Sequence, residues 1–180
     1  MNVDELFARL RASADEPYIG EPISQLEHAL QCAALARGAR ADDDMVVAAL
    51  LHDVGHLGAP DDAARMPELG VVDHEAIGAR IVREVGLPES VVWLVAHHVA
   101  AKRYLVATRS EYAARLSEAS KATLVLQGGP MNASEIAAFE AEPRWKAALR
   151  LRAWDEQAKL VGWSGPPLDE YRALVERLRT

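Results

Sequence analysis

The chain has 180 residues, a formal net charge of −7, 50% hydrophobic residues and one cysteine. This length suits one compact domain, and hydrophobic residues that are mainly Ala, Leu and Val favour helices. The negative charge argues against nucleic-acid binding, which needs a basic face, and a single cysteine excludes an internal disulfide framework. No signal-peptide pattern opens the chain and no stretch reaches the ~20 apolar residues of a membrane span, so we expect a cytoplasmic protein with no membrane partner.

In the first half of the chain, proline, glycine and capping residues divide the sequence into helices. Pro and Gly residues around Tyr18 predict a loop after the first helix, Ser24 with Glu27 forms a capping-box pattern, and Asp73 is the expected cap of a later helix. A surface loop is expected over Gly58–Gly70. The expected helices are Val3–Ala14, Ser24–Gly38, Asp42 to about Gly55, Asp73 to about Val85, and Pro88 to about Arg103.

The second half continues in the same way. Expected helices run over Ser110–Gln127, from Asn132, from Pro143 to about Val161, and over Leu168–Leu178. Asn132 with Glu135 is a second capping-box pattern. No segment alternates with period two and no repeat is present, so we predict a single all-α domain without a sheet.

Four of the six histidines follow a regular spacing. His28, His52, His74 and His98 are 24, 22 and 24 residues apart, which matches one helix plus one connection. Helices that face one another in a bundle can bring four such imidazoles together. Asp53 adds a carboxylate whose two oxygens can bridge two metal ions. Imidazole with carboxylate suits Fe, Mn, Co, Ni or Zn, and without a nearby cysteine a thiolate site is excluded.

Simpler interpretations compete with each of these residues. A lone histidine is usually a surface or hydrogen-bonded core residue, and His52-Asp53 could be a polar pair at a helix end. The pair follows an apolar run, however, and burying a polar group without a partner costs about 2–7 kcal/mol. A metal ion would compensate that cost. Of the two adjacent histidines we choose His98, because it shares a helix stripe with Val95 and Lys102, whereas His97 follows Trp93.

The segment Leu50–His56, together with the flanking histidines, resembles the HD-domain superfamily of metal-dependent phosphohydrolases. That resemblance implies an all-helical bundle with ligands in the order H…HD…H…H…D, and it places the final aspartate at Asp155. Without the resemblance, Asp155 would be read as a surface partner of Lys159.

A narrower resemblance rests on five further segments: 18–21, 25–28, 98–104, 127–131 and 152–155. They are similar to the organophosphonate-degrading branch of the superfamily, which are mixed-valence di-iron oxygenases that cleave a carbon–phosphorus bond and are relatives of myo-inositol oxygenase. The similarity runs from about Pro17 to Tyr171. His97 stands where that branch more often has glycine.

The resemblance implies a complete set of site residues. One iron would be held by His28, His52, Asp53 and Asp155, and the other by Asp53, His74 and His98, with Asp53 bridging. Tyr18 would be a ligand of the second iron that substrate displaces, and Glu21 would sense a substrate amine. The implied catalytic residues are Tyr18, Glu21, His56 and Lys102, and the implied substrate-binding residues are Glu21, His56, Lys102, Ser120, Thr123, Gln127 and Arg152.

The predicted organisation is therefore a single HD-type helical bundle. It has an N-terminal helix and lid loop over 1–23, a metal-binding bundle over 24–161 and a C-terminal helix over 168–180. Mixed-valent Fe(II)/Fe(III) and O2 would cleave a (1-hydroxy-2-aminoethyl)phosphonate-type small molecule to phosphate and glycine, or to an N-methylated glycine. The alternatives are a phosphohydrolase that acts on a phosphate monoester or nucleotide, and a non-catalytic metal-stabilised sensor. The substituent on the substrate nitrogen and the oligomeric state stay open.

Overall fold

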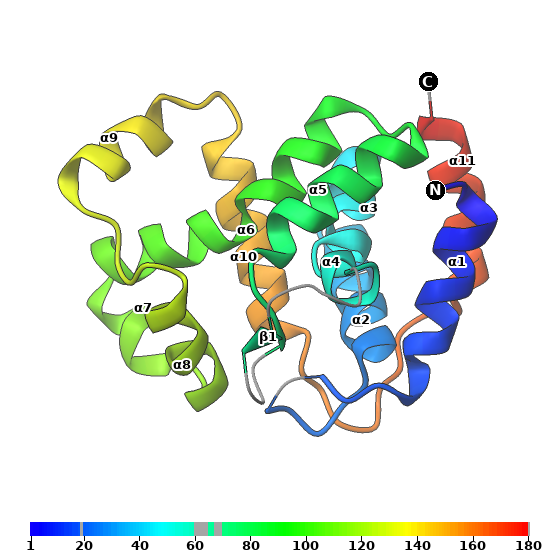
Figure 1. The fold of residues 1–180 in the computed structure, drawn as a ribbon, viewed down its shortest axis with the longest axis horizontal. Coiled ribbons are helices and arrows are strands. Elements are labelled where there is room, and N and C mark those ends of the chain that lie inside the picture. Colours follow the sequence, from blue (N-terminus) through cyan, green and yellow to red (C-terminus); the bar gives the residue numbers. More distant parts are fainter. Residues whose placement is uncertain (19, 60–64, 67–69, 180) are drawn as a thin grey trace.

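The fold is known from a computed structural model, which describes residues 1–18, 20–59, 65–66 and 70–179. Helices dominate it (Figure 1), which confirms the all-α prediction. The elements are α1 (Val3–Ala12), η1 (Ser13–Asp15), α2 (Gln25–Gly38), α3 (Asp43–Leu51), α4 (Val54–Leu57), β1 (Arg65–Met66), β2 (Gly70–Val71), α5 (His74–Val85), α6 (Glu89–Thr108), α7 (Ser110–Arg115), α8 (Glu118–Leu126), α9 (Ala133–Ala141), α10 (Trp145–Gln157), η2 (Leu168–Tyr171) and α11 (Arg172–Leu178).

The core lies between α2, α3, α5, α6 and α10. Helix α3 is the most enclosed, since every residue of Met45–Leu51 is buried. In Figure 1, α1 and α11 lie on one side of this centre and α7, α8 and α9 on the other. Among the described residues, no helix combines the length and the apolar character of a membrane span. The division into lid, bundle and terminal helix stays a prediction.

Both predicted capping boxes are confirmed. The Ser24 hydroxyl accepts the Glu27 amide at 3.1 Å while the Glu27 carboxylate accepts the Ser24 amide at 2.7 Å. Asn132 and Glu135 exchange the same pair of bonds at the start of α9. These bonds satisfy amides that have no partner within the helix, so the sequence fixes where α2 and α9 begin.

Other predicted boundaries were wrong. Asp73 makes no capping bond and instead takes a left-handed conformation with φ 55°. The single helix expected over Ser110–Gln127 is two, because Leu116 is extended and Ser117 caps α8. The helix expected to end near Gly55 ends at Leu51, and α10 ends at Gln157 rather than near Val161.

The predicted loop over Gly58–Gly70 lies partly outside the described residues, since 60–64 and 67–69 are not described. Within it, β1 and β2 form a two-residue antiparallel pair. We predicted no sheet, and this pair is too short to change the all-α assignment.

Helix α4 lies against α5 at unusually close range because both carry glycine at the contact. A Cβ on Gly55 would stand 1.9 Å from the His74 carbonyl oxygen and 2.9 Å from the Gly78 nitrogen. Those neighbours are backbone atoms, which cannot rotate away as a side chain can. The contact holds the start of α5, and therefore His74, next to the turn that carries Asp53.

Candidate metal centre

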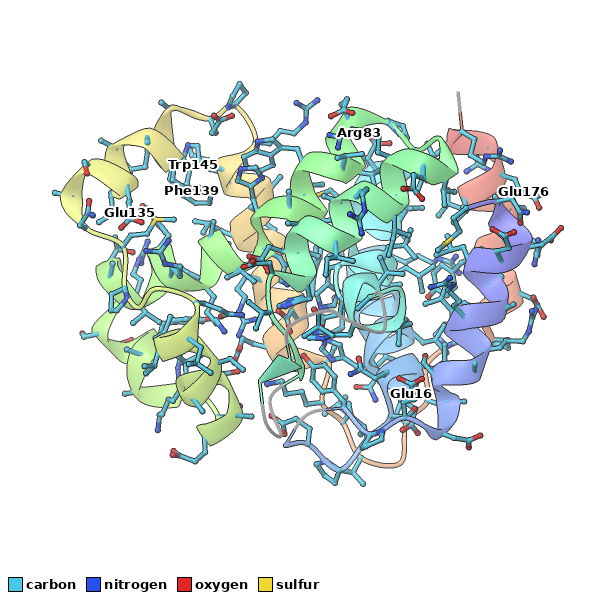
Figure 2. The ribbon with its side chains drawn as sticks, in the orientation of Figure 1. Glu16, Arg83, Glu135, Phe139, Trp145 and Glu176 are labelled. Carbon is cyan, nitrogen blue, oxygen red and sulfur yellow. The ribbon has the colours of Figure 1, made fainter. Side chains whose placement is uncertain are left out.

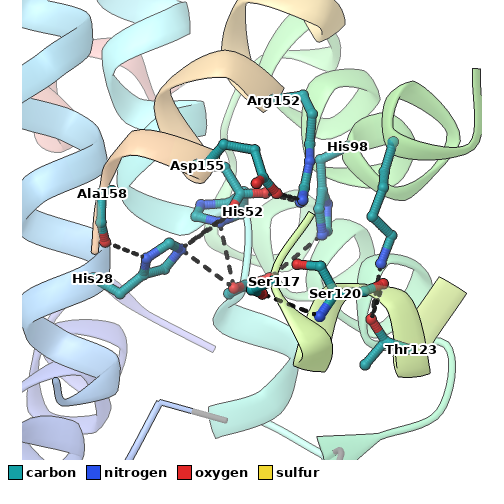
Figure 3. A network of polar contacts seen from close by, with 12 residues as sticks. His28, His52, His98, Ser117, Ser120, Thr123, Arg152, Asp155 and Ala158 are labelled. Carbon is teal, nitrogen blue, oxygen red and sulfur yellow. Dashed lines mark hydrogen bonds and ion pairs between the residues drawn. The ribbon is translucent and has the colours of Figure 1, made fainter. Parts of the chain in front are cut away.

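The six predicted metal ligands meet in the centre of the bundle. They come from five places in the fold: His28 on α2, His52 and Asp53 at the turn between α3 and α4, His74 at the start of α5, His98 on α6 and Asp155 on α10. All are buried except Asp53, which is partly buried. Figure 3 shows how His28, His52, His98 and Asp155 converge from different helices.

Asp53 divides its two carboxylate oxygens between two pairs of imidazoles. Its Oδ2 lies 3.3 Å from His52 Nε2 and 3.6 Å from His28 Nε2. Its Oδ1 lies 3.3 Å from His98 Nε2 and 3.4 Å from His74 Nε2. One carboxylate that faces two separate histidine pairs is the arrangement of a bridging ligand.

The histidine pairs fit metal ions because of how their protons are placed. The Nδ1 atoms of His28, His52 and His98 lie 2.8, 2.9 and 2.8 Å from the carbonyl oxygens of Ala158, Ala49 and Val95. A carbonyl only accepts, so each Nδ1 carries the proton and, in the neutral ring, Nε2 carries a lone pair. Such second contacts typically orient metal-bound histidines.

The Nε2 atoms of the four histidines face each other in pairs. His28 Nε2 lies 3.1 Å from His52 Nε2, and His74 Nε2 lies 3.0 Å from His98 Nε2. In the first pair both Nε2 atoms carry lone pairs, which repel at this distance unless a proton or a cation lies between them. His74 Nδ1 has no hydrogen-bond partner among the described residues, so no hydrogen bond fixes the proton of this ring. Neighbouring ligands of an octahedral ion with bonds of about 2.1 Å are about 3.0 Å apart, so the donor set fits a metal ion at each pair.

Asp155 completes the first of these groups. Its Oδ1 lies 3.5 Å from His28 Nε2 and accepts no hydrogen bond, although it is buried. Its Oδ2 accepts a hydrogen bond from Arg152. Burial alone would raise the pKa of Asp155, but the Arg152 charge lowers it well below its usual value, so the carboxylate stays ionised. The alternative of a surface pair with Lys159 is wrong, since Asp155 is 2% exposed.

His56 also lies close to this centre, and Asp53, His56 and His74 could by proximity hold an ion. The His56 ring stacks on His74 with centroids 4.1 Å apart. Its Nδ1 accepts the Val71 amide at 3.3 Å, so Nε2 of the neutral ring carries the proton and is a donor. Burial lowers the pKa of His56 to about 3, which keeps the ring neutral. This favours the predicted ligand set, with His56 as a hydrogen-bond donor.

A cavity of about 60 Å³ adjoins the ligands. The cavity is small and polar. All eight predicted catalytic and substrate-binding residues line it: Tyr18, Glu21, His56, Lys102, Ser120, Thr123, Gln127 and Arg152. The Tyr18 ring stacks on His28 with centroids 3.9 Å apart, which places the loop over the ligands. Burial, and then the charges of Asp53 and Asp155, raise the pKa of Tyr18.

Two of the predicted cavity residues, Lys102 and Arg152, are basic. Lys102 is buried and donates a hydrogen bond to Thr123 Oγ1 at 2.9 Å. Burial, and next the Arg152 charge, lower the pKa of Lys102 to about 7. Arg152 is less free than the sequence implied, because it also donates to the Tyr112 hydroxyl at 2.7 Å and to Asp155.

Lys159 is a cavity residue that sequence reasoning missed. Its ammonium lies 3.0 Å from Glu21 Oε1. Its spacing from Asp155 suggested one helix face, but α10 ends at Gln157, so helical spacing does not place it. His97 lies apart from the ligand set as expected, with its ring stacked on Trp93 at 4.0 Å between centroids.

Comparison with known proteins agrees with this geometry. The HD domain family model matches residues 26–139. A protein of Leisingera caerulea named (1-hydroxy-2-(trimethylamino)ethyl)phosphonate dioxygenase (glycine-betaine-forming) is 40% identical over 164 residues, which cover 91% of this chain and 83% of the relative. A hydroxymethylphosphonate dioxygenase of Gimesia maris is 39% identical over 163 residues, or 89% and 80% of the two chains.

An uncharacterized protein of Acanthamoeba polyphaga mimivirus is 39% identical over 175 residues, which cover 97% of this chain and 80% of that protein. The matched family region contains five of the six converging ligand candidates, and the alignments with the two dioxygenases extend over most of the chain. The chain therefore belongs to the HD domain family and is related there to the phosphonate dioxygenases.

Proposed function

We propose that this enzyme is an oxygenase that uses O2 to cleave the carbon–phosphorus bond of a short 1-hydroxyalkylphosphonate. The observation that carries the proposal is Asp53, whose two oxygens face two histidine pairs beside a small polar cavity that Lys102 and Arg152 line. The kinship with named phosphonate dioxygenases supports the oxygenase class. Overall, the reaction would consume one O2 and yield one carboxylate, one phosphate and one proton.

Two iron ions in the mixed-valent Fe(II)/Fe(III) state, held by the six ligands, would supply the redox chemistry and the site for O2. The protein's own residues have separate tasks. Lys102 supplies positive charge to the phosphonate, and Arg152 adds donors while it also pairs with Asp155 and Glu156. The His56 Nε2 proton is available to one of the phosphonate oxygens. Ser120, Thr123 and Gln127 add neutral polar contacts. Tyr18, stacked over His28, covers the ligands and limits the entry of water.

The finer prediction is a substrate of the (1-hydroxy-2-aminoethyl)phosphonate type, which would give glycine or an N-methylated glycine. It depends on Glu21, the carboxylate in the covering loop that could pair with an ammonium. A cytoplasmic location and the absence of a nucleic-acid partner also stay predictions from sequence.

Oxygen dependence is the decisive test of the proposed function. The reduced, iron-loaded enzyme supplied with hydroxymethylphosphonate and (1-hydroxy-2-aminoethyl)phosphonate should release phosphate in air and none under strict anaerobiosis. About two irons per chain and a mixed-valence EPR signal should accompany activity. Phosphate release that is undiminished without oxygen would instead establish the phosphohydrolase alternative, and a metal-loaded chain that turns over no phosphonate or phosphate ester would support the sensor.

Replacing Lys102 should weaken substrate capture and leave the metals in place. Lys102→Met removes a charge-assisted contact worth about 1.5–3 kcal/mol, so KM should rise by roughly 10- to 100-fold. The matched control is Lys121→Met on the exposed side of α8. Among the described residues Lys121 pairs with Glu118 alone, so this variant should change nothing. Metal content is measured in both, and a KM unaltered by Lys102→Met would remove that residue from the site.

The pH dependence provides an independent check on Lys102. Because the pKa of this residue in the folded protein is lowered to about 7, its ammonium is present below that pH and is lost above it. The ratio of the KM of Lys102→Met to the KM of the wild type should therefore decrease between about pH 7 and pH 9. Titration of the substrate affects both KM values equally, so it cancels in this ratio. Replacing Arg152 is a less clean test, since Arg152 also holds Asp155.

A further inference from the structure

Lys159 lines the cavity, yet no step of the proposed reaction uses it. Its Nζ lies 3.0 Å from Glu21 Oε1, and both side chains are largely buried, with 14% and 15% exposed. An ion pair shielded from water to this degree is stronger than a pair on the open surface.

The backbone on either side of Lys159 is held in place. The Ala158 carbonyl oxygen lies 2.8 Å from Nδ1 of the metal-ligand candidate His28. The Leu160 amide donates to Gln31 Oε1 at 2.9 Å, and the Leu160 carbonyl accepts from Gln31 Nε2 at 2.8 Å. Gln31 is fully buried on α2. Lys159 therefore leaves the chain from a fixed point and is directed to the loop that carries Glu21.

Glu21 is fixed on the opposite side. Its amide donates to the Tyr18 carbonyl at 3.0 Å and closes a turn in which Gly20 takes a φ of 70°. The Lys159 ammonium is close to Oε1, but this buried oxygen accepts no hydrogen bond of good angle. The contact is thus an ion pair in which the Lys159 ammonium neutralises the Glu21 carboxylate.

The other cavity residues offer little to a cationic substituent. Apart from the ligand candidates Asp53 and Asp155, Glu21 is the one carboxylate among the described lining residues. The aromatic lining consists of Tyr18 and histidines, so the cavity has no tryptophan or phenylalanine among those residues. Figure 2 shows Phe139 and Trp145 together between α9 and α10, where both pack against Tyr104.

We propose that Lys159 is a specificity-determining residue that takes the place of a substrate ammonium on Glu21. The cavity then favours short hydroxylated phosphonates without a cationic group over the aminoethyl type predicted from the sequence. An amine-bearing substrate must displace Lys159 from Glu21. This inference rests on the proposed function, because it presumes that phosphonates occupy the cavity.

The test compares two phosphonates that lack the reactive hydroxyl, 2-aminoethylphosphonate and ethylphosphonate. Their affinities are measured by calorimetry on the iron-loaded wild type, Lys159→Met and Lys159→Arg. Lys159→Met frees Glu21, so the affinity for the amine relative to ethylphosphonate should rise by about tenfold or more. Lys159→Arg keeps the ion pair and should keep the wild-type ratio. The kcat/KM ratio for the corresponding hydroxylated compounds should move in the same direction.

Each outcome decides the matter. If Lys159→Met left the affinity for 2-aminoethylphosphonate relative to ethylphosphonate unchanged, the inference would be overturned. An equal loss of affinity for both compounds would also overturn it, because Lys159 would then bind the phosphonate group. Phosphate release that does not depend on oxygen, combined with a shifted ratio, would overturn the proposed reaction and leave the role of Lys159 standing. Failure of the wild type to bind either phosphonate would overturn both.

Discussion

Asp53→Asn is expected to leave the enzyme with at most one tightly bound metal ion and without measurable oxygenation. The amide that replaces the carboxylate keeps one oxygen, so it can serve one histidine pair but not both. Loss of a partner that only orients a ligand typically costs 10–100-fold in activity. Loss of the bridge itself should exceed about 10²-fold in kcat, measured together with the iron count per chain.

The matched control is Asp73→Asn. Asp73 is an exposed aspartate directly before the ligand candidate His74, and it makes no capping bond. Its left-handed backbone, with φ 55°, suits asparagine, so this variant should keep two metals and full activity. Two firmly bound irons in Asp53→Asn would show that the carboxylate does not bridge, and the assignment of the site would have to change.

The sequence predicted the four histidines that converge, because their positions repeat with the length of a helix and its connection, whereas Asp155 was predicted from the family resemblance alone. The apolar run before His52 indicated a buried helix end, and α3 is indeed enclosed on all sides. Capping boxes located the starts of α2 and α9 for a local reason: the bonds join residues three apart. These features depend on short-range chemistry, which a sequence displays directly.

Long-range arrangements could not be read in the same way. The break between α7 and α8 follows from Leu116 taking an extended conformation, and no proline or glycine marks it. The approach of Lys159 to Glu21 joins residues from opposite ends of the chain and depends on the contacts of Gln31 with the segment after α10. For the α7–α8 break the one local signal was Ser117, which caps α8. The approach of Lys159 to Glu21 depends on tertiary packing, for which local pattern carries no signal.

Apolar packing of the helices holds the ligand candidates together before a metal ion binds. Buried carboxylates and imidazoles without a cation are unfavourable, so the apolar packing of α2, α3 and α6 has to hold the polar groups together. Once bound, metal ions stabilise the folded state by mass action. One of the ligand candidates, His74, is held by close backbone packing at Gly55.

Gly55→Ala is the second prediction with a large expected effect. A Cβ at this position would meet the His74 carbonyl oxygen at 1.9 Å, so α4 and α5 must separate. Overpacking of this kind costs about 1–3 kcal/mol or more, which for a domain of this size corresponds to a fall in Tm of roughly 2–12 °C. Because His74 moves with α5, iron held by His74 and His98 should be lost before iron held by His28 and His52.

Gly38→Ala separates this effect from a general response to removing glycine. Gly38 is the last residue of α2, and nothing lies within 4 Å of a Cβ placed there. Alanine should be neutral or raise stability by about 0.4–1 kcal/mol, because it restricts the unfolded chain. Thermal unfolding of the metal-free proteins measures how much Tm falls because of the overpacking. Iron titration then measures how firmly each variant binds its metal ions. If Gly55→Ala matched Gly38→Ala in both measurements, the close contact between α4 and α5 could not be what holds His74 beside Asp53.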